Sequence, residues 1–277
     1  MTTIGVFDSG VGGLSVLRAL RVEMPQARLV YLADNAFAPY GERAPAWVAD
    51  RSAAIAQHLR QAHAIDTLVV ACNTATALAI DTLRAAHPDL PIVGVEPALK
   101  PAAALTRSGQ VGVLATRGTL GSARYARLRE QQLQASTTPL QIHDQPCDGL
   151  ADAIERDDGP AIEALCQRYT QALRERAVAI DVLVLGCTHY PFAGDAIRRA
   201  AGPHVQLLDP AEPVARRVRA VAPALPGAAG LHLLATGDTA PLQRMARRWL
   251  DTDAAVEAVT VGPGDGEPES LATVSAP

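Results

Sequence analysis

Two stretches of the chain decide the fold: Leu68-Val-Val-Ala-Cys-Asn-Thr74 and, in the second half, Leu183-Val-Leu-Gly-Cys-Thr188. Each is a short apolar run that ends in a cysteine followed by small polar residues. Apolar runs of this kind between helical segments predict buried strands of a parallel sheet. Because the two stretches match, we expect two similar α/β units, each with one cysteine at the carboxyl end of a strand.

The remaining sequence alternates strand-like and helix-like segments in the same way. Strands are predicted at 4–7, 29–32, 67–71, 91–95, 110–115, 140–143, 182–185, 205–208 and 231–235. Helices are predicted around 14–20, 47–62, 74–86, 122–132, 149–176 and 194–201. This alternation predicts the α/β class with mainly parallel sheets, in two similar αβα domains that face each other.

The repeat of the pattern also predicts the domain boundaries. We expect a discontinuous first domain formed by residues 1–96 and 209–255, and a second domain formed by residues 97–208. Gly, Pro and acidic residues are frequent from residue 262 onward. Residues 256–277 are therefore predicted to be a disordered tail.

Composition excludes several classes of protein. The 277 residues are 48% hydrophobic and 19% charged, which is typical of a soluble globular protein. A net charge of -4 argues against binding to nucleic acid or to an acidic membrane. The sequence shows no export signal and no apolar stretch of the roughly 20 residues that a spanning helix needs. The predicted location is the cytoplasm.

The four cysteines do not form a CxxC pair, so neither a zinc site nor a thioredoxin-like motif is predicted. Cys166 lies at helical spacing among apolar residues, and Cys147 precedes a helix; both are interpreted as structural. Cys72 and Cys187 are different because they end equivalent strands. In open parallel sheets, ligands bind outside the carboxyl ends of the strands.

Two thiols on opposite sides of a substrate suit the exchange of an α-proton. One group must remove the proton and the other must return one to the opposite face, and a thiolate and a thiol can exchange these roles. A local positive field is needed to ionise a thiol, whose ordinary pKa is near 8.5. His189 lies two residues from Cys187, and Asp8 ends a neighbouring strand, so each can hold a proton for one thiol.

Small polar residues at the same strand ends can hold the carboxylates of a small dianion. They are Ser9, Asn73, Thr74 and Thr188, and Thr116 lies at the end of a further strand.

Two other functions fit parts of the sequence. Gly10-Val-Gly-Gly-Leu-Ser15 follows the first strand and Asp34 ends the second, as in an NAD-dependent dehydrogenase. However, Ser15 replaces the third glycine, and Asp8 would repel a pyrophosphate. A thiol hydrolase using Cys187 and His189 is also conceivable, but it leaves Cys72 unexplained.

The ordered set of motifs resembles the glutamate racemases of the aspartate/glutamate racemase family. The matching segments run collinearly from residue 4 to about residue 250. They are Phe7-Asp-Ser-Gly-Val-Gly-Gly13, Asp34 with Pro39-Tyr-Gly41, Ala71-Cys-Asn-Thr-Ala-Thr76, Val93-Gly-Val-Glu-Pro-Ala-Leu-Lys-Pro101, Ala115-Thr-Arg-Gly-Thr119, Leu185-Gly-Cys-Thr-His-Tyr-Pro191 and Ala235-Thr-Gly-Asp238.

The resemblance implies two pseudo-symmetric αβα domains with the active site between them, where glutamate binds with no cofactor and no metal. The cysteine that acts on D-glutamate matches Cys72, and the one that acts on L-glutamate matches Cys187. The assisting groups match Asp8 and His189, with Glu155 as a further acidic residue. The substrate-binding positions match Asp8, Ser9, Tyr40, Gly41, Asn73, Thr74, Thr116, Thr188 and His189.

The resemblance also carries expectations about biology. It implies that D-glutamate is supplied for peptidoglycan synthesis, and that a uridine-diphosphate muramyl precursor acts as an activator, as in some Gram-negative variants. Family members differ in how they dimerise, so a homodimer is left open. Aspartate racemase, or another amino-acid racemase of the superfamily, is the alternative activity.

Overall fold

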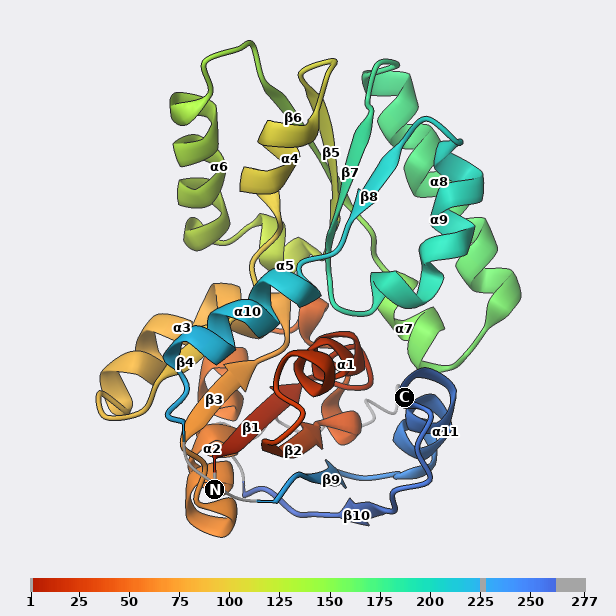
Figure 1. Ribbon diagram of the computed structural model, residues 1–277. Coiled ribbons are helices and arrows are strands. Elements are labelled where there is room, and N and C mark those ends of the chain that lie inside the picture. The colour runs from red at the N-terminus through yellow and green to blue at the C-terminus, as the bar shows by residue number, and fades with distance from the viewer. Residues whose placement is uncertain (1, 225–227, 263–277) are drawn as a thin grey trace, which may run out of the picture.

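The computed structural model describes residues 2–224 and 228–262 and contains two parallel sheets. Figure 1 shows them in separate lobes of the molecule. The first sheet has the strand order β10-β9-β2-β1-β3-β4. Its strands are β1 (Thr3–Asp8), β2 (Arg28–Ala33), β3 (Thr67–Val70), β4 (Ile92–Gly94), β9 (Gly230–Ala235) and β10 (Val256–Ala258).

The second sheet has four strands in the order β6-β5-β7-β8. They are β5 (Gln110–Ala115), β6 (Gln141–Pro146), β7 (Val182–Gly186) and β8 (Gln206–Leu208). Every pairing in both sheets is parallel. The predicted α/β class with mainly parallel sheets is therefore confirmed.

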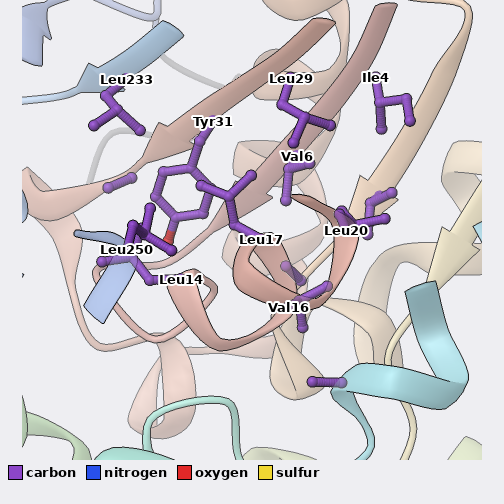
Figure 2. Close-up of a cluster of buried hydrophobic side chains, with 14 of the residues drawn as sticks. Ile4, Val6, Leu14, Val16, Leu17, Leu20, Leu29, Tyr31, Leu233 and Leu250 are labelled. Atoms are coloured by element: carbon purple, nitrogen blue, oxygen red, sulfur yellow. The ribbon is translucent and has the colours of Figure 1, made fainter. Parts of the chain in front are cut away.

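Helices cover both faces of the first sheet because successive strand residues point to opposite faces and both sets are apolar. On β1, Ile4 and Val6 join one hydrophobic cluster, whereas Phe7 joins the cluster on the other face. Figure 2 shows Leu14, Leu17 and Leu20 pointing from helix α1 toward the first face. The helices are α1 (Leu14–Glu23), α10 (Ala211–Val221) and α11 (Ala240–Leu250) on that face, and α2 (Pro45–His63) and α3 (Asn73–Ala86) on the other.

The second sheet is covered in the same way by two further clusters. One face carries α7 (Leu150–Glu155), α8 (Gly159–Arg176) and α9 (Gly194–Ala201), and the other carries α4 (Leu99–Leu105) and α6 (Ala123–Ala135). None of the helices in the described ranges is long and apolar enough to cross a membrane.

Two differences from the sequence-based expectations have a clear physical reason. The single helix predicted for 149–176 is broken, because Asp157 adopts a left-handed conformation (φ 54°) and the Asp158 side chain caps α8 by accepting from the Ala161 amide. In addition, residues 256–258 of the predicted tail form strand β10, which pairs with β9. A three-residue edge strand is too short to show an alternating pattern. Residues 263–277 lie outside the described range.

Strands β1 to β4, β9 and β10 come from both ends of the chain, and β5 to β8 come from its middle. This membership supports the proposed division after residues 96 and 208, and we propose to extend the first domain to include β10.

Candidate active site

The carboxyl ends of four strands meet where the two sheets face each other. Asp8 ends β1, Cys72 follows β3, Thr116 follows β5 and Cys187 follows β7. Hydrogen bonds between side chains connect the two lobes at this point. The Thr188 hydroxyl donates to Asp8 Oδ2 at 2.9 Å, and the hydroxyl oxygens of Thr74 and Thr116 lie 2.9 Å apart. The residues predicted for one site are thus brought together from both halves of the chain.

Cys187 lies at one end of a buried chain of acid/base groups. Its Sγ is 3.6 Å from Nδ1 of His189, and Nε2 of the same ring is 2.6 Å from Oε1 of Glu155. The imidazole is only 3% exposed. Burial alone would lower the pKa of His189, but its hydrogen bonds to Cys187 and Glu155 outweigh burial and raise the pKa well above the ordinary value. The contacts with Cys187 and Glu155 therefore favour the positively charged form of the ring.

The glycine-rich turn after β1 is required by this chain of groups. A Cβ atom on Gly12 would lie 2.3 Å from Nδ1 of His189, and one on Gly10 would lie 1.8 Å from Oε1 of Glu155. The Val11 amide, between these glycines, donates to the same Glu155 oxygen at 2.8 Å. The turn is thus glycine-rich so that a carboxylate and an imidazole from the second lobe can approach its backbone.

Cys72 is the N-cap residue of helix α3, and its Sγ accepts a hydrogen bond from the Ala75 amide at 3.4 Å. The thiol also lies 3.9 Å from the Ser9 hydroxyl. Burial raises the pKa of Cys72 far above its ordinary value, and the negative charge of Asp8 raises it further. Cys72 is therefore a thiol at neutral pH, in contrast to the positively charged surroundings of Cys187.

Asp8 is fully buried, and hydrogen bonds reach both of its carboxylate oxygens. Oδ1 accepts from the Gly10 amide at 2.8 Å and from the Ser9 hydroxyl at 3.4 Å. Burial raises the pKa of Asp8 to about 6, although the positive charge of His189 opposes this shift. Asp8 forms hydrogen bonds with Thr188, Gly10 and Ser9, and it acts on Cys72 through its charge and through Ser9.

Two of the predicted substrate-binding residues, Tyr40 and Asn73, use their side chains for hydrogen bonds within the protein. The Tyr40 ring is fully buried, and its hydroxyl donates to Asp34 at 2.5 Å. A Cβ on Gly41 would lie 2.8 Å from Cγ2 of Thr116, so this loop touches the second lobe. The Asn73 amide nitrogen donates to the Val95 carbonyl at 3.3 Å.

Asp34 cannot act as the ribose-binding acid of a dinucleotide fold. It is fully buried and is bound by Tyr40, by Arg51 and by the Thr236 hydroxyl. Its carboxylate oxygens are therefore already occupied. Together with the steric role of the glycines, this removes the structural basis for the dehydrogenase alternative.

The other two cysteines are buried in the core of the second lobe. Cys147 and Cys166 are each 2% exposed and belong to the hydrophobic cluster beneath α8 and α9. Burial raises the pKa of the Cys166 thiol to about 12, which keeps it protonated at neutral pH. In the described part of the chain, no group of three or more His, Cys, Asp or Glu residues could hold a metal ion.

Two residues of the site were not found from the sequence. The Ser15 hydroxyl lies 3.1 Å from the Thr188 carbonyl and thus links α1 to the turn that bears Cys187. The Tyr31 hydroxyl donates to the Gly10 carbonyl at 2.6 Å; in Figure 2 it points toward the beginning of α1. Tyr31 follows the ordinary alternation of a buried strand, and this pattern gives no signal for its polar contact.

Comparison with known proteins agrees with this geometry. The sequence profile described as Asp/Glu/Hydantoin racemase matches residues 14–218. The chain belongs to this family. Glutamate racemase from Ralstonia pickettii is 43% identical over 281 residues, covering 99% of this chain and 97% of the relative. The activity of the chain is accordingly that of a glutamate racemase, as its motifs predicted.

Solved structures give the same result. A glutamate racemase isoform from Bacillus anthracis superposes with a TM-score of 0.81 at 31% identity, covering 94% of this chain and 98% of that one. Escherichia coli glutamate racemase, in complex with L-glutamate and the activator UDP-MurNAc-Ala, has the same TM-score at 30% identity and the same coverage. The predicted racemase family is confirmed, and the enzyme is an isomerase.

Proposed function

We propose that the enzyme interconverts L- and D-glutamate by proton exchange between Cys72 and Cys187. One observation carries this proposal: two thiols end equivalent strands of facing sheets, and their surroundings favour opposite protonation states. The charged His189 ring beside Cys187 favours a negative sulfur, whereas burial keeps Cys72 protonated. One base and one acid are therefore available at the same time.

The proton balance follows from these states. The Cys187 thiolate takes the α-proton of L-glutamate and becomes a thiol, and the electron pair remains on the α-carbon and its carboxylate. The Cys72 thiol then gives its proton to the opposite face of the α-carbon and becomes a thiolate. The product is D-glutamate, and the reverse reaction uses the same groups in exchanged roles.

The small polar residues of the site are suited to hold the substrate. The amides at the N-terminus of α3, near Asn73 and Thr74, favour an anion such as a carboxylate. Asn73 Oδ1 is buried and has no hydrogen-bond partner among the described residues, so it offers an acceptor for the α-ammonium group. We assign the second carboxylate to the hydroxyls of Thr116 and Thr188 and to the Tyr40–Gly41 backbone.

Deuterium exchange tests the assignment of each thiol to one face. In deuterium oxide, the wild-type enzyme should place deuterium on the α-carbon during racemisation. Cys72→Ala should lose racemisation but still exchange the α-proton of L-glutamate, because Cys187 remains. Cys187→Ala should exchange only D-glutamate. Cys147→Ala and Cys166→Ala are matched controls and should stay fully active; racemisation by either catalytic-cysteine variant would refute the scheme.

We further propose that a uridine-diphosphate muramyl precursor activates the enzyme at a second site. A cavity of about 490 Å³ lies beside β4 and is lined by Arg84, Arg124 and Arg217. Arginines suit the diphosphate of such a ligand. The cavity is also lined by Thr76, whose hydroxyl accepts a hydrogen bond from the Val95 amide at 3.1 Å. Thr76 lies in helix α3, which begins directly after Cys72.

Activation can be tested by adding the precursor during steady-state assays. Turnover should rise in the wild-type enzyme and stay at the basal level in Arg217→Ala. Arg216→Ala is the matched control, since Arg216 is paired with Glu212 on the same helix and does not line the cavity. Activation that survives Arg217→Ala and Arg84→Ala would place the activator elsewhere.

The remaining expectations concern the cell. We propose that the enzyme works in the cytoplasm and supplies D-glutamate for peptidoglycan. Depletion of the protein in its host should stop cell-wall growth, and external D-glutamate should restore it. Continued growth of depleted cells without external D-glutamate would contradict this role.

A further inference from the structure

A buried ion pair lies beneath the loop that carries Tyr40 and Gly41. Arg51 of helix α2 is 4% exposed and Asp34 is 0% exposed. The guanidinium binds the carboxylate through two parallel hydrogen bonds, from Nε at 2.8 Å and from Nη2 at 2.7 Å. Bidentate pairs of this kind are the strongest and most directional ion pairs in proteins.

Asp34 uses the same carboxylate to hold the loop and the first sheet. Oδ2 accepts from the Tyr40 hydroxyl at 2.5 Å, and Oδ1 accepts from the Thr236 hydroxyl, which follows β9, at 2.7 Å. Because the Tyr40 ring is fully buried, its hydroxyl depends on this acceptor. The position of the Tyr40–Gly41 backbone is thus fixed through Asp34.

The other end of Arg51 binds the last described residues of the chain. Its Nη1 lies 3.0 Å from the carbonyl oxygens of both Val261 and Gly262. The Val261 side chain is 8% exposed and belongs to the same hydrophobic cluster as Tyr40. The guanidinium also lies over the ring of Phe37, 4.5 Å from its centroid, in the segment just before the loop.

We propose that Arg51 is a positioning residue, and that the carbonyls of Val261 and Gly262 are part of the support of the glutamate site. Without these carbonyls, two guanidinium protons are left unpaired in a buried position, and the Arg51–Asp34 pair must shift to regain partners. Asp34 would then move the Tyr40 hydroxyl and the Gly41 backbone, which touches Thr116 across the lobes. The segment after β10 therefore controls substrate affinity.

The proposal rests on the proposed role of the Tyr40–Gly41 backbone in binding glutamate. The loop contacts substrate and not the migrating proton, so its displacement changes KM more than kcat. A loss of folded protein would have the opposite signature, a lower apparent kcat with an unchanged KM.

The test compares two shortened chains and two point variants. A chain ending at Val259 loses both carbonyls but keeps the hydrogen bond from the Val259 amide to the Ala235 carbonyl. A chain ending at Gly264 keeps both carbonyls and is the matched control. Arg51→Lys retains the charge but lacks the fork that reaches Asp34 and the carbonyls together; Arg51→Gln removes the charge as well.

The chain ending at Val259 and both Arg51 variants should show KM raised roughly tenfold for each enantiomer, with kcat within about threefold of wild type. The chain ending at Gly264 should match the wild type. A wild-type KM in folded Arg51→Lys, or a fall in kcat alone, would overturn the proposal. If Cys72→Ala or Cys187→Ala were fully active, the proposed function would fail instead, whatever the Arg51 variants showed.

Discussion

Replacement of Glu155 by Gln changes one charge in the buried chain that ends at Cys187. The Gln side chain has the shape of the Glu side chain and retains an oxygen that can accept from the backbone amide of Val11. In the wild-type protein this amide lies 2.8 Å from Oε1 of Glu155. His189 loses the negative partner that lies 2.6 Å from its Nε2. Because burial alone lowers the pKa of this imidazole, the pKa of His189 should fall in the variant. The ring then no longer favours a negative sulfur on Cys187.

The magnitude follows from the burial of the pair. The His189 and Glu155 side chains are 3% and 12% exposed, so solvent screens their interaction little. Removing one partner of a buried ion pair costs about 3–5 kcal/mol. If about 3 kcal/mol of this appears in the step that needs the Cys187 thiolate, the rate of that step should fall roughly 100-fold.

The assay must separate the two half-reactions. Enantiomers have equal free energies in water, so any variant must change kcat/KM equally in both directions, and steady-state rates cannot show which thiol is affected. Exchange in deuterium oxide can. In a Cys72→Ala background, Glu155→Gln should slow exchange of L-glutamate roughly 100-fold. In a Cys187→Ala background, exchange of D-glutamate should change by less than about threefold. Equal slowing in both backgrounds would refute this account.

Further predictions concern three positions, Asp8, Gly12 and Tyr31. The pKa of Asp8 is raised to about 6, so kcat/KM should fall as pH decreases through about 6. This fall should be absent in Asp8→Asn, and its persistence in the variant would show that Asp8 is not the titrating group. The raised pKa favours the protonated carboxyl in the folded state, so stability is lost as pH rises from about 4 to 6. Asp8→Asn should therefore increase the free energy of unfolding by up to about 3 kcal/mol at pH 7.5 but not at pH 3.5, measured by urea titration. Gly12→Ala should lower kcat/KM more than about 100-fold, because its methyl group would displace His189, whereas Gly159→Ala, where nothing lies within 4 Å, should be neutral. Tyr31→Phe leaves a buried carbonyl unpaired and should reduce stability by about 1–3 kcal/mol and lower exchange of both enantiomers; loss of stability without loss of exchange would show that the hydroxyl only supports the fold.

Patterns local in the sequence predicted much of the fold and the core of the site. The two apolar runs that end in Cys72 and Cys187 place both thiols correctly, because parallel strands carry their polar residues at one edge. Strands β1, β2 and β9 were found within one residue, because their apolar residues are buried on both faces.

The contacts missed by the sequence reasoning connect residues far apart in the chain. Glu155 reaches Val11 across 144 residues, and Arg51 reaches Val261 across 210. Neither residue lies in a distinctive local pattern, since each reads as an ordinary charged helix residue. Tyr40 was identified, but only the structure shows that its hydroxyl is directed to Asp34. Such roles depend on how helices pack, and no local periodicity encodes that.

The discontinuous first sheet has a consequence for biosynthesis. The chain leaves the ribosome from its N-terminus, and domains tend to fold as units when their residues are available. All strands of the second sheet, β5 to β8, have been synthesised once residue 208 is added, whereas the first sheet still lacks β9 and β10. The first lobe is therefore begun first and completed last. The hydrogen bonds from Arg51 to the carbonyls of residues 261 and 262 can form only after those residues have been synthesised. A nascent chain released early should hold a folded second lobe without racemase activity.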